Sequence, residues 1–292
     1  MAQDDSVQVE LPLGYWIEEK HRRNSTLRAM HGADEVFLSE MGQSLPPAQW
    51  TTSLLGRCIV ELDGIGRPDL GAVRNLTIGD REALLLQLRR LTFGDSVPLV
   101  LTCPETACKS KMDLTLSTRN LLVAPYPSPQ QRHEAVVAED GYSYRVRFRL
   151  PTGGDQEATA PLGLRDPQAA ERQLLDRCIE SIVLEDGDRA LDEMPFAVRQ
   201  ELPGVMLELD PQAEVSLQTH CSSCGSSFVT LFDAGSFVRQ ELAASLTKLY
   251  KEVHMLAYYY HWSESEILHA TARRRRAYLE ILDEALRQGG GG

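Results

Sequence analysis

The sequence predicts an α+β fold made of two related halves, each with a helix pair and a cysteine-bearing β-hairpin, followed by a C-terminal helical arm. Three observations predict it. Short cysteine pairs close two similar stretches of chain, Cys103 with Cys108 and Cys221 with Cys224. The segment Leu54–Ile59 recurs as Leu174–Ile179 with five of six positions identical. Everything after Asp233 has a helical pattern.

The predicted boundaries follow from the same observations. Residues 1–120 would form the first half and residues 121–233 the second half, which includes a central strand. Residues 234–288 would form the arm. Residues 289–292, which are four glycines, would form a flexible tail. A chain of 292 residues can bury a large core, as one domain or as two closely packed halves.

Composition narrows the class of protein. Hydrophobic residues make up 42% and charged residues 25% of the chain, which is ordinary for a globular protein. The chain has 42 acidic and 30 basic residues, so its formal charge is −12. This charge argues against nucleic acid or an anionic membrane as the main partner, because phosphate binding depends on Lys and Arg.

The predicted compartment guides the interpretation of the cysteines. The start of the chain, Met1–Asp5, is acidic and has no apolar stretch, which does not fit a secretory signal. No apolar run approaches the roughly 20 residues that span a bilayer. In a reducing compartment, cysteine pairs indicate metal or redox sites before disulfides.

The first half contains the following predicted elements. Trp50, Leu54 and Cys58 recur at helical spacing, and Thr77 reads as a helix N-cap with an acid three residues on. The expected elements are a short β unit over residues 8–30, helices at Ala33–Met41, Pro47–Val60 and from Thr77 to about Arg90, a loop at Arg67–Gly71, a short strand at Val73–Leu76, and strands Leu99–Thr102 and Met112–Leu116 on either side of the first cysteine pair.

The second half begins with the clearest strand in the chain, Tyr142–Leu150, whose polar and apolar side chains alternate. Pro151 and the residues after it end this strand. The expected elements after it are helices at Asp166–Val183 and Phe196–Leu209, which Pro203-Gly204 could interrupt, and strands Glu214–Thr219 and Phe228–Phe232 around the second cysteine pair.

The arm is predicted to contain two helices. Asp233 or Ser236 could cap the first, which runs to about Tyr260. Ser263–Glu266 is a capping box that starts the second, and this helix passes Arg273–Arg276 and ends near Arg287. The arm is expected to have no counterpart in the first half.

The four paired cysteines predict one structural zinc ion, bound by Cys103, Cys108, Cys221 and Cys224. Four thiolates in two pairs are the ligand set of a closed zinc site, and each pair would lie in a turn between two strands. The second pair, Cys-Ser-Ser-Cys-Gly, is a good zinc knuckle. The first pair is wider, with four residues between its cysteines, but lies within the known range.

Other interpretations of the cysteines remain open. The four thiols could be buried and free, or Cys221-x-x-Cys224 could be a redox dithiol, although a helix directly behind its first cysteine is not expected. His220 could replace one sulfur, but a solvent-facing histidine is the favoured interpretation. Cys58 and Cys178 lie in apolar helical contexts and are expected to be core residues.

The remaining motifs do not indicate an enzyme. His254, His261 and His269 lack the spacing of a zinc protease, and the sequence shows no G-x-S-x-G, Walker loop or dinucleotide fingerprint. Successive arginines on a helix splay around its axis, so the run Arg273–Arg276 is expected to be a solvated face or to meet an acidic partner. We therefore expect no catalytic residues and no other cofactor.

Several segments resemble one protein family over nearly the whole chain. The segments are Leu11–Tyr15, Leu91–Asp95, Arg149–Gly153, Phe232-Asp233, Ser236-Phe237, Glu252–Ala257, Tyr260–Glu264, Ile267-Leu268 and Arg273–Glu280. They are similar to the T4-type baseplate hub assembly proteins, which are chaperone-like and are encoded with contractile phage tails and bacterial contractile injection systems. Members often carry Cys-x-x-Cys-Gly at both knuckles. The first pair here departs from that pattern by its insertion and by Lys109 in place of glycine.

The resemblance implies a non-enzymatic protein that builds, or remains within, the baseplate hub. Its partners would be other baseplate, hub, spike or tube-end subunits, with no nucleic acid and no membrane insertion. It would lie in the bacterial cytoplasm, in or on its way to a tail-like particle. The alternatives are a zinc-ribbon accessory protein that associates with nucleic acid and a thiol oxidoreductase.

Overall fold

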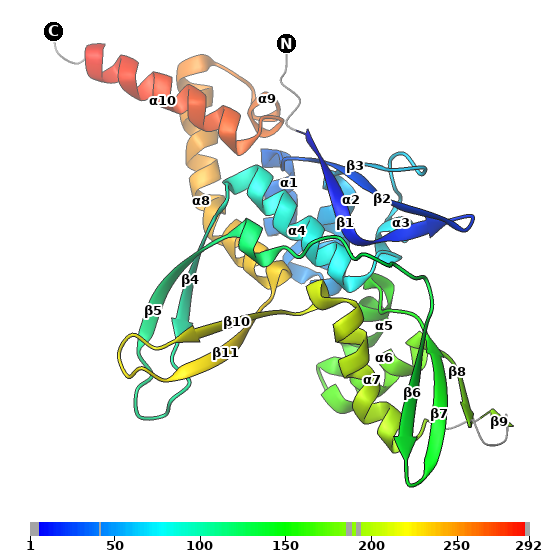
Figure 1. The fold of residues 1–292 in the computed structure, drawn as a ribbon. Helices are drawn as coiled ribbons and strands as arrows, with labels where there is room; N and C mark the ends of the chain where they lie inside the picture. Colours follow the sequence, from blue (N-terminus) through cyan, green and yellow to red (C-terminus); the bar gives the residue numbers. More distant parts are fainter. Residues whose placement is uncertain (1–5, 41, 185–188, 191–193, 290–292) are drawn as a thin grey trace.

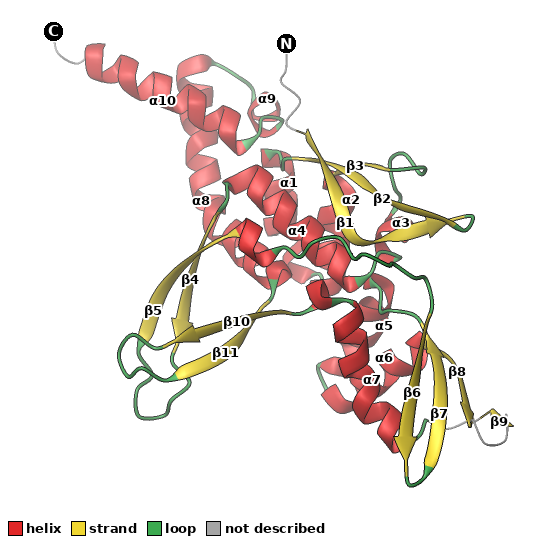
Figure 2. Ribbon diagram, viewed as in Figure 1, coloured by secondary structure: helices red, strands yellow, loops and turns green. Residues whose placement is uncertain are grey.

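The computed structural model describes residues 6–40, 42–184, 189–190 and 194–289. Half of the chain is helix and 28% is strand, which confirms the α+β class. Figures 1 and 2 show helices at the centre with strands in separate small sheets around them. The acidic start Met1–Asp5 and the end of the predicted tail, residues 290–292, lie outside the described residues.

The first unit, residues 6–117, begins with a three-stranded antiparallel sheet of β1 (Ser6–Ile17), β2 (Lys20–Arg28) and β3 (Ile59–Leu62). Glu18 and Glu19 form the β1–β2 turn with positive φ angles of 47° and 66°, as a tight two-residue hairpin requires. The expected β unit is therefore present as a long hairpin. Helices α1 (Gly32–Glu40) and α2 (Pro47–Cys58) follow, as predicted, but β3 was not predicted.

The segment after β3 corrects one prediction. Residues expected to form a loop and then a short strand instead contain helix α3 (Leu70–Arg74). The Asp69 carboxylate accepts the backbone N–H of Ala72 and caps the helix, a local signal that outweighs the β-branched Val73. Helix α4 (Ile78–Phe93) begins as predicted, with the Thr77 hydroxyl accepting the N–H of Asp80 at 3.3 Å.

The second unit, residues 133–232, follows a similar order of elements, with strand β9 in the place of helix α3. Its sheet has the order β6 (His133–Glu139), β7 (Tyr142–Phe148), β8 (Ile179–Leu184) and β9 (Arg189–Ala190). Helices α5 (Gly153–Gly163) and α6 (Pro167–Cys178) separate β7 from β8.

One prediction for this unit is wrong and two elements were not predicted. The helix expected over Asp166–Val183 ends at Cys178, because Ile179–Leu184 is rich in β-branched residues and pairs with β7. Strand β6 and helix α5 were missed; Pro151 does end the strand before it, but the next residues open α5 through a capping box of Thr152 and Asp155. Helix α7 (Phe196–Leu209) runs through Pro203 without a break.

A β-hairpin ends each unit. Strands β4 (Ser96–Thr102) and β5 (Lys111–Ser117) form the first, and β10 (Val215–His220) and β11 (Ser227–Phe232) form the second, each as a separate two-stranded antiparallel sheet. The short 3₁₀ turn η2 (Thr118–Leu121) follows the first hairpin, and η3 (Pro211–Ala213) lies between α7 and the second. Figure 1 shows the two hairpins extending from the body on the same side and overlapping towards their tips.

The arm contains α8 (Ala234–Tyr260), α9 (Glu264–Leu268) and α10 (Ala272–Gly289), and α10 projects from the body in Figure 1. The Ser263–Glu266 capping box is confirmed, but it opens the short α9 and not one long helix. The arm was expected to have no counterpart in the first unit, and its long helix α8 has none, but α9 with the start of α10 resembles α3 with the start of α4. Helices α9 and α3 both have five residues and a capped start, and a threonine, Thr271 or Thr77, precedes the long helix after each.

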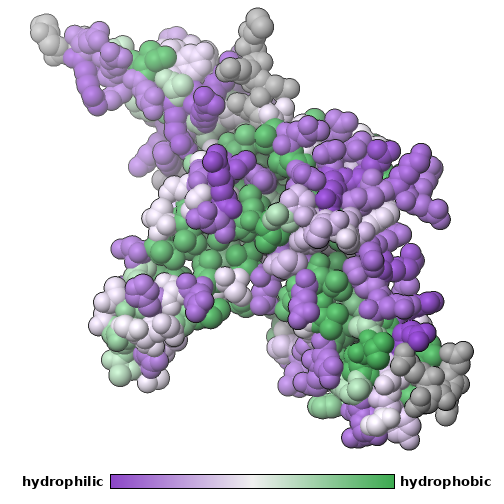
Figure 3. Space-filling model, in the orientation of Figure 1, coloured by the Kyte–Doolittle hydropathy of each residue, from purple (hydrophilic) through white to green (hydrophobic). Residues whose placement is uncertain are grey.

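Two clusters of buried residues form the core. The first includes Trp50, Leu54 and Leu84 and extends to Val238 of the arm. The second surrounds Phe148 in the second unit. Figure 3 shows hydrophobic residues gathered over α4 and the base of the hairpins, while β1–β3 and α10 are largely hydrophilic. Among the described helices, none combines the length and the apolar character needed to cross a bilayer.

Candidate metal centre

The structure brings the four predicted cysteines together at the tips of the two hairpins. Their Sγ atoms all lie within 4.8 Å of one another. The shortest contacts join the hairpins crosswise, at 3.7 Å for Cys103 to Cys224 and 3.8 Å for Cys108 to Cys221. These distances exceed the roughly 2.05 Å of a disulfide bond, and all the cysteines are free.

The sulfur spacing matches a tetrahedral metal site. A tetrahedral Zn²⁺ with Zn–S bonds of about 2.3 Å places its sulfurs about 3.8 Å apart. The two crosswise contacts have this length. The donor set and its geometry therefore fit a four-thiolate zinc ion.

The second knuckle, Cys221–Gly225, is held by backbone hydrogen bonds. The Cys221 N–H donates to Ser226 O at 2.8 Å and the Gly225 N–H donates to Cys221 O at 2.8 Å. Gly225 has a φ of 77°, which glycine adopts without strain. The Ser223 N–H points at Cys221 Sγ at 3.4 Å. Such N–H groups stabilise a thiolate and so prepare it for metal binding.

The first knuckle, Cys103–Lys109, has a wider turn but ends in the same way. The Cys103 N–H donates to Ser110 O at 2.9 Å and the Cys108 N–H donates to Glu105 O at 3.0 Å. Lys109 has a φ of 50°, in the left-handed region that Gly225 occupies at the other knuckle. The chain therefore adopts the turn in which glycine would be favoured, although lysine occupies the position.

The thiols differ in burial and in acidity. Cys103 and Cys221 are buried, Cys108 is partly buried and Cys224 is exposed. Backbone N–H groups of Cys224 and Ser223 lower the pKa of the Cys221 thiol to about 6. The hydroxyl of Ser110, 3.1 Å from Cys108 Sγ, lowers the pKa of that thiol as well.

The other cysteines and His220 do not contribute to this cluster. Among the described residues, the only group that could hold a metal ion contains the four paired cysteines alone. His220 is exposed. Cys58 and Cys178 are fully buried in the two cores, and burial raises the pKa of each to about 12.

The arginine run of the arm is not a uniform face. Arg273, Arg274 and Arg276 are exposed, but Arg275 is only 2% exposed. Its guanidinium donates to Glu35 at 2.8 Å and to Glu252 at 2.9 Å. The expectation of a solvated or partner-facing run is therefore wrong for Arg275, which attaches the arm to α1.

A cluster of ion pairs that occurs once in each unit was not predicted from the sequence. In the first unit Asp34 accepts hydrogen bonds from Arg28 and Arg57, and in the second Asp155 accepts them from Arg149 and Arg177. Burial opposes ionisation of Asp155, but hydrogen bonds from Arg149 and Thr152 outweigh it and lower its pKa to about 2. The signal was present, because an arginine ends or directly follows each strand and each helix opens with a glycine and has an aspartate two residues later.

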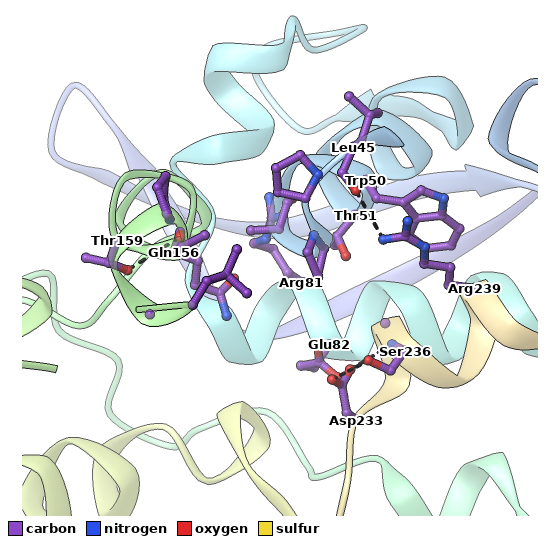
Figure 4. A pocket seen from close by; sticks show the side chains of 18 of the residues that line it. Leu45, Trp50, Thr51, Arg81, Glu82, Gln156, Thr159, Asp233, Ser236 and Arg239 are labelled. Carbon is purple, nitrogen blue, oxygen red and sulfur yellow. Dashed lines mark hydrogen bonds between the residues drawn. The ribbon is translucent and has the colours of Figure 1, made fainter. Parts of the chain in front are cut away.

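A hollow of about 760 Å³ lies between α2, α4, α5 and the start of α8 (Figure 4). Its lining includes Trp50, Arg81, Glu82 and Arg239. Arg81 is buried and donates to Thr52 and to carbonyl oxygens, while burial raises the pKa of Glu82 to about 7. The lining contains no cysteine or histidine, and the Ser236 hydroxyl in it donates to the capping carboxylate of Asp233 at 2.7 Å.

A comparison with protein families gives a match for this chain. The model of the T4 bacteriophage base plate protein family matches residues 46–239. The chain belongs to the T4 bacteriophage base plate protein family. The matched span contains α2, both hairpins and all four clustered cysteines, and it ends within α8. The searches of curated proteins and of solved structures gave no match.

Proposed function

We propose that this base plate family protein is a non-enzymatic component or assembly factor of the central baseplate hub of a contractile tail or contractile injection system, stabilised by one structural zinc ion. The observation that carries the proposal is the meeting of four thiols from two distant hairpins inside the span that matches the family. The proposed ligands are Cys103, Cys108, Cys221 and Cys224.

The proposed role of the zinc is to hold two related halves, residues 1–120 and 121–233, as one body. A two-stranded hairpin is marginally stable alone, and each hairpin here pairs with no third strand among the described residues. Structural zinc contributes on the order of 10 kcal/mol of apparent binding free energy. One ion shared by both hairpins would therefore fix the tip of each against the other.

The proposed partners are other subunits of the baseplate, such as hub, spike or tube-end proteins. The formal charge of −12 favours basic faces of ring subunits and disfavours nucleic acid or anionic membrane as partner. The arm, residues 234–288, is a candidate for the segment that holds a partner subunit. The protein would act in the assembled tail-like particle or on the way to it.

Metal analysis of purified variants tests the zinc site. The wild-type chain is expected to carry one zinc per chain. Cys103→Ser and Cys224→Ser should both lose the zinc and be destabilised to a similar extent, because each leaves an open coordination position. Cys58→Ser is the matched control, since it makes the same change in the core and should keep the zinc. A wild-type protein without zinc, or zinc retained by Cys224→Ser, would contradict the site.

Mass spectrometry of assembled tail particles and of assembly intermediates tests the role. Presence of the chain in either, together with baseplate subunits, is the expected result. A chain found in neither that binds polyanions with a steep salt dependence would replace the proposal with the nucleic-acid accessory protein. Reduction of disulfides by the metal-free chain would instead support a thiol oxidoreductase.

A further inference from the structure

Three long helices carry an arginine as their fourth residue. Helix α4 begins at Ile78 and has Arg81, α10 begins at Ala272 and has Arg275, and α7 begins at Phe196 and has Arg199. Two of these arginines take part in the same kind of contact between different parts of the chain.

The first contact joins the arm to the first unit. His31 forms a β-bridge with Thr271, and the Gly32 N–H donates to Ala270 O at 3.2 Å. Gly32 opens α1, and Arg275 lies over it so closely that a Cβ on this glycine would be 3.0 Å from Arg275 Nη1.

The second contact joins the first unit to the second. Thr152 forms a β-bridge with Thr77, and the Gly153 N–H donates to Leu76 O at 3.1 Å. Gly153 opens α5, and a Cβ on it would be 2.3 Å from Arg81 Cζ. The two contacts are thus of the same kind. In each, the start of a long helix, with its arginine, packs on the segment where a strand ends and a glycine opens the next helix.

The receiving segment is the same in both contacts. It consists of the end of a strand, a glycine that opens a helix, and an aspartate two residues later. The aspartates, Asp34 and Asp155, each accept two arginines and so hold the strand end against the helix start. A Cβ on Gly153 would overlap Arg81, and a Cβ on Gly32 would press on Arg275, so glycine gives the docking arginine room in both contacts.

The third helix start has no such segment docked on it among the described residues. Phe196 of α7 is 64% exposed, whereas Ala272, the first residue of α10, is 3% exposed. Arg199 is only partly buried, although its Nε, like that of Arg81, is enclosed without a hydrogen-bond partner among the described residues. Its two counterparts, Arg81 and Arg275, are 1% and 2% exposed beneath the segments they contact.

We propose that the start of α7, with Phe196 and Arg199, is a docking surface for a glycine-initiated helix of a neighbouring subunit. The two internal contacts define the occupant, since each shows what this kind of helix start binds. The occupant is a different protein and not a second copy, because both receiving segments of this chain, at Gly32 and Gly153, already hold Arg275 and Arg81. The inference rests on the proposed function only in taking the neighbour to be another baseplate subunit.

Binding of the full-length chain to each purified baseplate subunit encoded with it tests the proposal. The double variant Phe196→Glu with Arg199→Glu should bind one subunit at least about 30-fold more weakly than the wild type does, as loss of a central interface contact does. Leu164→Glu with Arg165→Glu is the matched control, because it makes the same changes at two exposed positions of the second unit. In the subunit that is bound, replacing the glycine that opens the contacting helix with leucine should weaken binding to the same degree.

The outcomes separate the two proposals. Circular dichroism and zinc content equal to those of the wild type show that the double variant is folded, and a single change, Phe196→Ser, provides a milder second variant. If the folded variants bind every subunit as the wild type does, the docking surface is wrong while the baseplate role stands. If the wild-type chain self-associates and the double variant does not, the occupant is a second copy and the proposal is overturned. A chain that binds no baseplate subunit and is absent from particles contradicts the proposed function itself.

Discussion

Lys109 shows how one residue departs from the pattern of its own molecule. It follows the second cysteine of the first knuckle, where the other knuckle has Gly225, and both residues have positive φ angles, 50° and 77°. The left-handed conformation costs an L-residue about 1–2 kcal/mol relative to glycine. A hydrogen bond from Lys109 Nζ to Pro104 O at 2.9 Å is exposed and offsets little of this cost.

Lys109→Gly is therefore expected to stabilise the zinc-bound protein by about 1 kcal/mol, because glycine relieves the strained backbone without disturbing the ligands. The measurement is the free energy of unfolding in denaturant with zinc in excess. Lys109→Ala is the control, since it removes the same side chain and keeps the strain. Equal stability of the glycine and alanine variants would show that the turn is not strained at this position.

At this scale the sequence predicted the cysteines well and the charges poorly. Two cysteines on either side of a short turn have few uses, and the chain has two such pairs. The spacing of the cysteines alone therefore indicated that the four thiols meet. Nothing in the run Arg273–Arg276 marks Arg275 as the buried one. Its burial depends on Glu35, which lies far away in the chain and becomes a neighbour only through the docking of the arm.

At the scale of elements, most helices with an apolar stripe were predicted, but the capped helices α3 and α5 and the short strands that follow helices were not. Helices α2 and α6 pass directly into β3 and β8 at Ile59 and Ile179. Helical periodicity continues smoothly through these points, and only pairing with β2 or β7 makes the residues beyond them strands. Such pairing is a tertiary interaction that a local pattern does not contain.

The arm offers a test at the same scale. Arg275→Met should destabilise the packing of α9 and α10 by about 3 kcal/mol, because Glu35 and Glu252 would remain buried without their cationic partner. Burial already raises the pKa of Glu35. The readout is faster hydrogen exchange and proteolysis confined to the arm.

Arg274→Met is the matched control for the arm, since Arg274 is the exposed neighbour of Arg275. It should leave exchange in α10 unchanged. Equal loosening by the two variants would mean that the run stabilises the helix through its total charge and not through the buried contact.

At the scale of the whole molecule, the sequence predicted two units that meet through their cysteines, but not their other contacts. Besides the cysteines, a buried polar network joins them. Asp80 accepts N–H groups of Leu13 and Gly14 at 2.9 and 3.0 Å, and Asp210 accepts the Gly79 N–H at 3.0 Å and the Tyr126 hydroxyl at 2.6 Å. Single acids scattered along a sequence give no sign of such a network. The residues of this network are far apart in the sequence and come together only where the two units meet.

The network makes stability depend on pH in a direction that can be derived. Burial raises the pKa of Asp80 from 3.8 to about 7, and the neighbouring charge of Asp210 adds to the effect. Between these two pKa values the folded protein holds a proton that the unfolded chain has lost. Stability therefore falls as the pH rises through this window, by at most about 1.4 kcal/mol per pH unit, and levels off above the folded-state pKa.

Asp80→Asn removes this ionisation and keeps an oxygen that can accept one of the N–H groups. The difference in unfolding free energy between wild type and Asp80→Asn should shift in favour of the variant from pH 6 to pH 8, measured with zinc in excess. Glu82, whose pKa is also raised to about 7, is present in both proteins, so the difference isolates Asp80. Asp113→Asn, an exposed change on β5, controls for net charge. A difference that stays constant over this range would mean that Asp80 is ionised throughout and that its backbone hydrogen bonds, not burial, set its charge.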